Sequence, residues 1–271
     1  MNYYLKPFED LLVEQKSSSL WITLNRPDAS NAYSTGMVKA LVEVLKHADQ
    51  DNSVRAIVIT GTGKNFCAGG DIKAMRGKTG MFAGESNELR ETYQSGIQQI
   101  PLTISQLHTP LIAMVNGAAV GAGCDLAAMC DLRIASSSAV FAETFAKVGL
   151  VPGDGGAFFL TRLIGYGKAM EMFLTCRNYS AEEALKMGLV NEVVLPDQLK
   201  SRTSEIVEEL VSLPPIALQM TKKAIIHGEQ SDLISHLELV AAYQGITQRS
   251  SDHFKALDGM IEKKKQTFGH T

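Results

Sequence analysis

The sequence predicts an α/β fold, and three observations support this class. Short apolar runs alternate with amphipathic segments in the first half of the chain, strand patterns fade after Ala135, and helical patterns dominate from Ser180 onward. The 271 residues suffice for one large domain, or for a domain with a helical appendage. With 45% hydrophobic and 20% charged residues, the chain can bury an ordinary core, and long disorder is not expected.

Five apolar runs and two amphipathic segments define the first half. Met37–Ala48 is a predicted helix because its apolar residues recur every three or four positions, and Ser34 or Thr35 can cap its start. Asn87–Leu107 is predicted as a second, single helix. The predicted strands, rich in Val, Ile and Leu, are Leu11–Glu14, Leu20–Asn25, Ala56–Gly61, Leu111–Val115 and Leu132–Ala135.

The C-terminal part is predicted to be helical. Ser180 and Glu183 form a capping box before a short helix, and Gly188 ends it. Because Pro196 interrupts the chain, we expect a core over residues 1–196 and a helical subdomain over residues 197–271. Three further helices are expected in that subdomain, at Asp197–Leu213, Ile216–His227 and Leu233–Arg249.

Composition argues against several partners. The 26 Lys and Arg against 29 Asp and Glu give a net charge of −3, and no stretch is basic enough to follow a nucleic-acid backbone. The least polar stretch, Leu111–Cys130, contains Asn116 and Asp125, so we expect no membrane span. The 4 cysteines show no CxxC spacing and nothing upstream resembles a secretory signal, which indicates free thiols and a cytoplasmic protein.

Two glycine-rich segments each follow a predicted strand. In the first, Asn65–Lys73, small residues let a ligand approach the backbone; the alternative is a surface turn before a helix that Asp71 caps. The second, Val115–Leu126, leads into a helix whose first amides and positive dipole end would stabilise an anionic oxygen. The alternative interpretation of this segment is that its glycines allow close packing of the helix, and that the negative charge of Asp125 offsets the positive end of the helix dipole. One amide from each segment would make a two-donor oxyanion hole.

The chain resembles the crotonase superfamily, the enoyl-CoA hydratases and isomerases, across nearly its whole length. This resemblance implies a crotonase-like spiral of ββα repeats with a C-terminal helical region that builds trimers or dimers of trimers. It also implies an acyl-CoA substrate, no metal and no separate cofactor, since CoA is part of the substrate. The matches, in the family's order and spacing, are Asn25-Arg26-Pro27 with Asn31-Ala32, Phe66 to Lys73, Asn116 to Asp131, Val148 to Gly156, and Ala184 to Val190.

The resemblance also implies a binding site. In the family the thioester oxygen lies between two backbone amides, which here match Ala68 and Ala122. Arg26 and Lys73 lie beside the matching loops and are candidate contacts for the CoA phosphates. The other candidate substrate contacts are Gly69, Gly70, Asp71, Ile72, Gly121 and, for the acyl group, Phe145.

Family hydratases use two glutamates, at the positions of Asp125 and Phe145, and a phenyl ring cannot transfer a proton. Two other acids are candidates. Glu143 would point to the same side as Phe145 in an extended segment, and Asp154 is one residue from the base of double-bond isomerases. The alternatives are a solvated or salt-bridged acid at Glu143 and a helix N-cap at Asp154. We therefore predict Asp125, Asp154 and Glu143 as the catalytic carboxylates.

Together these features predict an enzyme that stabilises a thioester enolate and catalyses hydration or double-bond isomerisation of an enoyl-CoA. Two other functions fit the same fold. A CoA-binding paralogue without catalysis would explain Phe145. A thioester hydrolase or decarboxylase would use the same oxyanion hole, since fold and hole do not fix the reaction.

Overall fold

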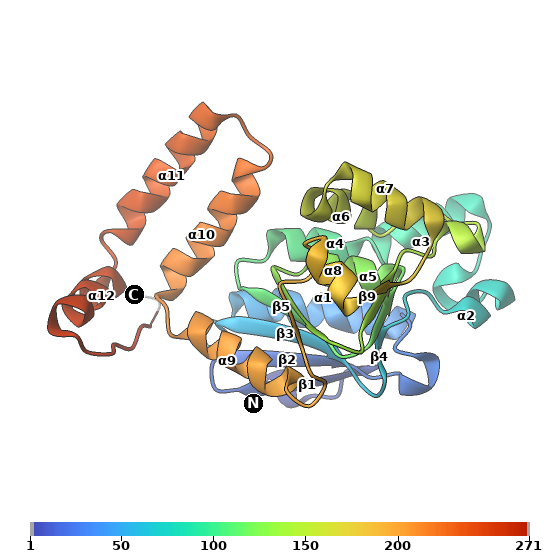
Figure 1. Ribbon diagram of the computed structural model, residues 1–271, viewed down its shortest axis with the longest axis horizontal. Helices are drawn as coiled ribbons and strands as arrows, with labels where there is room; N and C mark the ends of the chain where they lie inside the picture. The colour runs from blue at the N-terminus through green and yellow to red at the C-terminus, as the bar shows by residue number, and fades with distance from the viewer. Residues whose placement is uncertain (1–2, 270–271) are drawn as a thin grey trace.

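The central element of the fold is a six-stranded sheet in the order β1-β2-β3-β5-β7-β10. In the computed structural model, which describes residues 3–269, β1 runs antiparallel to β2 and the other neighbours are parallel (Figure 1). All five predicted strands lie in this sheet, and β10 joins them. The bounds are β1 (Leu11–Lys16), β2 (Ser19–Leu24), β3 (Ala56–Gly61), β5 (Leu111–Val115), β7 (Leu132–Ser136) and β10 (Glu192–Val194).

A second sheet contains four shorter strands in the order β4-β6-β8-β9. A strand of the main sheet, a strand of the second sheet and then an α-helix follow one another at β3-β4-α2, β5-β6-α5 and β7-β8-α6. This order is the predicted spiral of ββα repeats. The second-sheet strands are β4 (Asn65–Cys67), β6 (Ala118–Val120), β8 (Val140–Ala142) and β9 (Tyr179–Ser180), too short for the alternating pattern that predicts strands.

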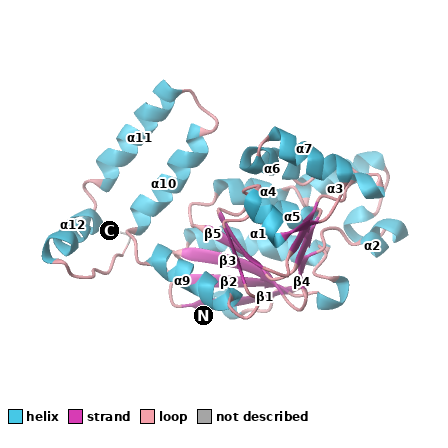
Figure 2. Ribbon diagram, in the orientation of Figure 1, coloured by secondary structure: helices cyan, strands magenta, loops and turns pink. Residues whose placement is uncertain are grey.

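The helices from α1 to α9 pack around the two sheets, and the last three extend away from them (Figure 2). Ser34 caps the first α-helix by accepting a hydrogen bond from the Met37 amide, and Ser180 and Glu183 form the predicted capping box. The α-helices are α1 (Thr35–Gln50), α2 (Ile72–Gly77), α3 (Ser86–Ser95), α4 (Gln99–Gln106), α5 (Ala122–Met129), α6 (Gly156–Ile164), α7 (Tyr166–Thr175), α8 (Ala181–Lys186), α9 (Leu199–Val211), α10 (Pro215–Gly228), α11 (Leu233–Thr247) and α12 (Ser251–Glu262). Short 3-10 helices are η1 (Tyr3–Leu5), η2 (Pro27–Ala29), η3 (Gly80–Phe82) and η4 (Ala146–Val148).

The prediction of a single helix over 87–107 is wrong. Gly96, with φ −109° and ψ −106°, separates α3 from α4. The break lets α4 bury Ile100 and Ile104 in the core, whereas none of the α3 side chains is buried. Core packing therefore decides the direction of α4 over the continuous helical pattern.

Both faces of the main sheet are covered, because side chains of a strand alternate between them. Ile57 and Ile59 of β3 belong to the large core that also contains residues of α1 and α5. Ala56 and Val58 face the other way and pack in a second cluster with Leu199 and other α9 residues. The α9 helix packs on the main sheet, whereas α10, α11 and α12 extend away from the sheets (Figure 1). The division into a core over residues 1–196 and a helical subdomain over residues 197–271 stays a prediction.

Candidate active site

The loop between β4 and α2 contains the first predicted amide donor. The Ala68 amide donates to the Ser30 carbonyl oxygen at 2.9 Å, so it is already satisfied and the prediction that it faces a ligand is wrong. Two residues further on, the Gly70 amide has no acceptor within residues 3–269. Gly70 is therefore the amide in this loop that can donate to a ligand.

The second predicted donor opens α5. The Ala122 amide has no acceptor in the described part of the chain, as expected for the first turn of a helix. Gly69 brings the loop to it: its φ is +80°, and a Cβ there would lie 2.6 Å from the Val120 carbonyl oxygen and 2.9 Å from the Ala122 nitrogen. Only glycine fits so close an approach. The structure thus places the loop that carries the Gly70 amide directly against the positive end of α5.

Three carboxyl groups converge beside this helix. Asp125 lies in the first turn of α5, Glu143 follows β8 and Asp154 precedes α6; they are 0%, 0% and 3% exposed. Gly156 of α6 permits the approach, because a Cβ there would overlap with the Asp125 carboxyl group. Within the described residues, both oxygens of Asp125 and of Glu143, and Oδ1 of Asp154, have no hydrogen-bond partner. The structure therefore brings together all three predicted catalytic acids in a buried cluster.

Burial and mutual repulsion keep protons on this cluster. Burial raises the pKa of Asp125 well above its usual range, and the carboxyls of Glu143 and Asp154 raise it further. Burial raises the pKa of Glu143 to about 8, although the neighbouring Cys124 thiol and Asp125 carboxyl oppose the shift. The pKa of Asp154 is also raised, again chiefly by burial. The cluster therefore keeps protons near neutral pH and can supply a general acid.

The alternatives for two of these acids do not hold. Glu143 is buried and has no ion pair among the described residues, so it is not a solvated or salt-bridged acid. Asp154 does not cap α6, whose N-cap is Gly155 without a side-chain hydrogen bond. The predicted extended segment from Glu143 to Phe145 is also wrong, because β8 ends at Ala142 and Phe145 has helical torsion angles, φ −57° and ψ −50°.

The predicted phosphate contacts have different surroundings. Arg26 donates to the Ala32 carbonyl at 2.6 Å and to the Asp71 carboxylate at 3.2 Å, so its guanidinium connects two loops of the chain. Asp71 caps α2 by accepting from the Lys73 and Ala74 amides, which is the structural alternative given for it. Lys73 faces solvent and stays available to an anion.

Side chains with apolar surface lie beside Gly121 and Gly70. The Phe145 ring lies beside Gly121, 3.9 Å from where a Cβ of residue 121 would be. The Met75 methyl group covers Gly70, and the exposed Ile72 precedes it on α2.

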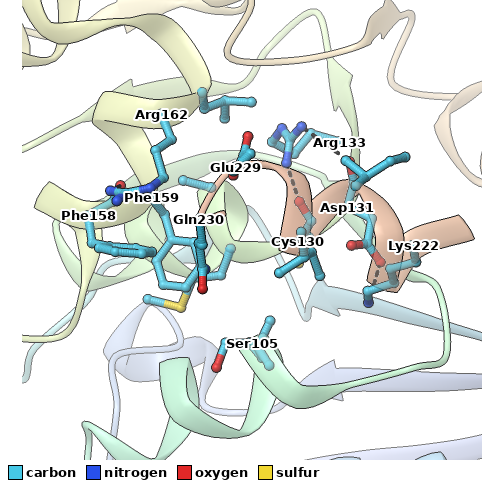
Figure 3. A pocket seen from close by; sticks show the side chains of 16 residues that line it. Ser105, Cys130, Asp131, Arg133, Phe158, Phe159, Arg162, Lys222, Glu229 and Gln230 are labelled. Carbon is cyan, nitrogen blue, oxygen red and sulfur yellow. Dashed lines mark hydrogen bonds and ion pairs between the residues drawn. The ribbon is translucent and has the colours of Figure 1, made fainter. Parts of the chain in front are cut away.

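A cavity of about 350 Å³ lies apart from the carboxyl cluster, between α4, the end of α5, α6 and α10 (Figure 3). Its cations are engaged within the chain. Arg133 donates to the carbonyls of Cys130 and Leu189, and Lys222 pairs with Asp131 at 2.7 Å. Asp131 also accepts from the Leu111 amide at 2.7 Å, so it is a structural acid.

Comparisons with known proteins identify the family and the fold. Residues 14–271 match the family model described as enoyl-CoA hydratase/isomerase. The chain is 36% identical to a short-chain-enoyl-CoA hydratase of Clostridium acetobutylicum, covering 94% of this chain and 96% of that protein. It is 31% identical to the 1,2-epoxyphenylacetyl-CoA isomerase of Escherichia coli, covering 96% and 98%. A crystal structure of an enoyl-CoA hydratase from Bacillus anthracis superposes with a TM-score of 0.91 at 32% identity, covering 97% and 100%.

Proposed function

Because the chain belongs to the enoyl-CoA hydratase/isomerase family, we propose that it stabilises the enolate of an enoyl-CoA thioester between the Gly70 and Ala122 amides. Removing a proton from the acyl chain, or adding water to it, builds negative charge on the thioester oxygen. One preorganised amide donor at that oxygen contributes about 10² to 10³ in rate. The observation that carries the proposal is the meeting of two unbonded amides with three buried carboxyls at the first turn of α5.

Within this class, we propose that the reaction is a shift of the double bond. A carboxylate of the cluster removes a proton from the carbon next to the double bond, the electrons move into the enolate, and a carboxylic acid of the cluster returns a proton at the far end. No atom is gained or lost. The apolar Phe145 and the burial of all three acids support a reaction without a water nucleophile.

Hydration is the second candidate, and the position of Glu143 favours it. Its carboxyl faces Asp125 inside the cluster, so a pair of acids exists although position 145 has none. One of them would activate water at the β carbon, and the other would protonate the α carbon.

Product mass distinguishes these reactions. A panel of 2-enoyl-, 3-enoyl- and dienoyl-CoA thioesters is incubated with the protein: isomerisation leaves the mass unchanged, hydration adds one water, and hydrolysis releases free CoA. Asp125→Asn and Asp154→Asn are assayed separately and together, with the exposed Glu182→Gln as a matched control. We expect each active-site variant to lose at least tenfold in kcat. Unchanged rates in the double variant would remove both acids from the mechanism, and tight binding without turnover of any thioester would indicate the inactive paralogue.

The proposed chemistry uses only amides and carboxyl groups, so we propose that it needs no metal ion and no cofactor other than the CoA of its substrate. Full activity after dialysis against EDTA is the expected result. We also propose a cytoplasmic location, which is supported by four cysteines that are all buried and free. No helix within residues 3–269 combines the length and apolarity needed to cross a bilayer.

We further propose that the chain forms a homotrimer or a dimer of trimers through α10–α12. This region leaves large apolar side chains exposed, more than a surface in water usually tolerates. They include Ile225, Leu233, Ile234, Leu237, Ile246, Phe254, Met260 and Ile261. Light scattering on the wild type and on Ile234→Asp would test this: we expect a trimer or hexamer that the variant dissociates, and a monomeric wild type contradicts it.

A further inference from the structure

We infer that Tyr33 is a positioning residue that holds the two amides of the oxyanion hole at a fixed separation. It lies in the segment between η2 and α1, it is 2% exposed, and nothing in the sequence pattern marked it as part of the site. The inference rests on the proposed function, because it concerns how the Gly70 and Ala122 amides are kept in place.

The main chain of Tyr33 fixes one side of the hole. Its amide donates to the Gly69 carbonyl oxygen at 2.8 Å, and Tyr33 and Gly70 form an isolated parallel bridge. The same segment holds the preceding turn of the loop, since the Ser30 carbonyl accepts from the Ala68 amide. These bonds set the peptide that carries the free Gly70 amide.

The side chain of Tyr33 fixes the other side. Its hydroxyl is directed at the Ala122 carbonyl oxygen at 3.5 Å, which is a long hydrogen bond inside the core. Ala122 is the first residue of α5, and its own amide is the second donor of the proposed hole. One residue therefore contacts both donor segments, through a backbone bond on one side and a side-chain bond on the other.

The surroundings of Tyr33 keep its hydroxyl protonated, so that it can donate a hydrogen bond. Burial raises the pKa of Tyr33 well above its usual range, and the thiol of Cys67 and the carboxyls of Asp154 and Asp125 act in the same direction. The phenol is thus neutral across the working pH range and can donate continuously. Its ring also packs in the main core, which fixes its orientation.

Small displacements of the two amide donors should lower the rate, because an oxyanion hole stabilises negative charge only when its donors are correctly placed. Donors must lie within roughly 0.5 Å of the productive position, and a misplacement of about 1 Å can cost about 10² in rate. A single hydrogen bond has a net worth equivalent to about threefold to tenfold in an equilibrium or rate. We therefore expect a partial loss of transition-state stabilisation when the hydroxyl is removed, with substrate binding nearly unchanged.

The test compares Tyr33→Phe with Tyr179→Phe. Tyr179 on β9 is a matched control: it is 1% exposed, its ring lies under the Arg177 guanidinium, and its hydroxyl has no hydrogen-bond partner among residues 3–269. The probe is 4-(dimethylamino)cinnamoyl-CoA, whose absorption moves to longer wavelength when its thioester carbonyl is polarised by hydrogen bonds. For Y33F we expect a smaller red shift of the bound probe and a kcat lowered about threefold to tenfold, with KM within twofold. Y179F should match the wild type in the red shift of the bound probe, in kcat and in KM.

The red shift of the probe bound to the wild type distinguishes failure of this inference from failure of the proposed function. If the wild type binds the probe without any red shift, the oxyanion hole itself is wrong. If the wild type shows the shift and Y33F retains both shift and kcat, or if Y179F loses as much as Y33F, the role of Tyr33 is refuted. Thermal unfolding confirms that each variant is folded. Should Y33F not fold, Tyr33→Leu, a second apolar side chain without the hydroxyl, undergoes the same comparison.

Discussion

Glu143→Gln should remove the part of the pH dependence of stability that Glu143 contributes to the carboxyl cluster. The wild-type side chain is fully buried, both of its oxygens lack a partner in the described chain, and burial raises its pKa from 4.5 to about 8. The native state therefore holds this proton over a pH range in which the unfolded chain has released it. In that range the free energy of unfolding falls as pH rises, and the loss levels off above pH 8.

The magnitude follows from the two pKa values. The interval between 4.5 and about 8, at about 1.36 kcal/mol per unit, corresponds to about 4 to 5 kcal/mol of stability lost between low and high pH. Glutamine does not ionise, so the variant avoids this loss. Its amide leaves a buried donor unpaired, at a cost of about 1 to 3 kcal/mol at every pH. E143Q should thus be less stable than the wild type at pH 5 and more stable at pH 9.

Urea unfolding followed by circular dichroism at pH 5, 7 and 9 measures the effect. The exposed Glu182→Gln serves as the control, because it makes the same chemical change away from the cluster. We expect the E182Q curve to run parallel to the wild type over this range. If E143Q also runs parallel, Glu143 is ionised in the native protein at neutral pH, and the argument for a protonated cluster is wrong.

Three further predictions concern other parts of the fold. Gly69→Ala would place a Cβ 2.9 Å from the Ala122 nitrogen, at a residue whose φ is +80°. Steady-state kinetics should show kcat lowered about 10²-fold, and thermal unfolding should show a loss of stability of about 1 to 3 kcal/mol. A kcat near that of the wild type contradicts the close approach of the loop to α5. Lys222→Ala removes the partner of Asp131 at 2.7 Å. Because Asp131 is exposed, the loss should be about 1 kcal/mol in urea unfolding while kcat of the folded protein stays unchanged; a loss of kcat alone would place Lys222 in the active site. Ser180→Ala removes the capping box of α8 and should cost about 1 kcal/mol without changing kcat, and an unchanged melting temperature would show that the cap is not needed.

The central strands of the main sheet could be predicted because they are buried on both faces and therefore have continuous apolar sequences, as Ala56–Gly61 does. The second sheet could not, since its strands have only two or three residues. The end of α3 at Gly96 depends on the docking of α4 into the core, which a local pattern does not contain.

The site was predictable in its parts and not in its detail. The three acids were found, although the extended geometry assumed for Glu143 does not exist beyond Ala142. The choice between the Ala68 and Gly70 amides depends on a hydrogen bond to Ser30, in a loop distant along the chain. Such a bond is a tertiary property, so glycine-rich composition identifies the loop without identifying the donor.

The carboxyl cluster lowers the stability of the native state, because the backbone segments packed closely around it keep its acids buried. Glycine at positions 69 and 156 lets the donor loop and α6 reach α5, and these contacts exclude the water that would otherwise solvate the acids. Each buried, unpaired carboxyl lowers the free energy of unfolding when it ionises, and the same burial retains the proton that catalysis needs near neutral pH. Substitutions that neutralise the cluster should therefore increase stability at alkaline pH in the same variants that lose activity, whereas a variant that gains both would separate the two effects.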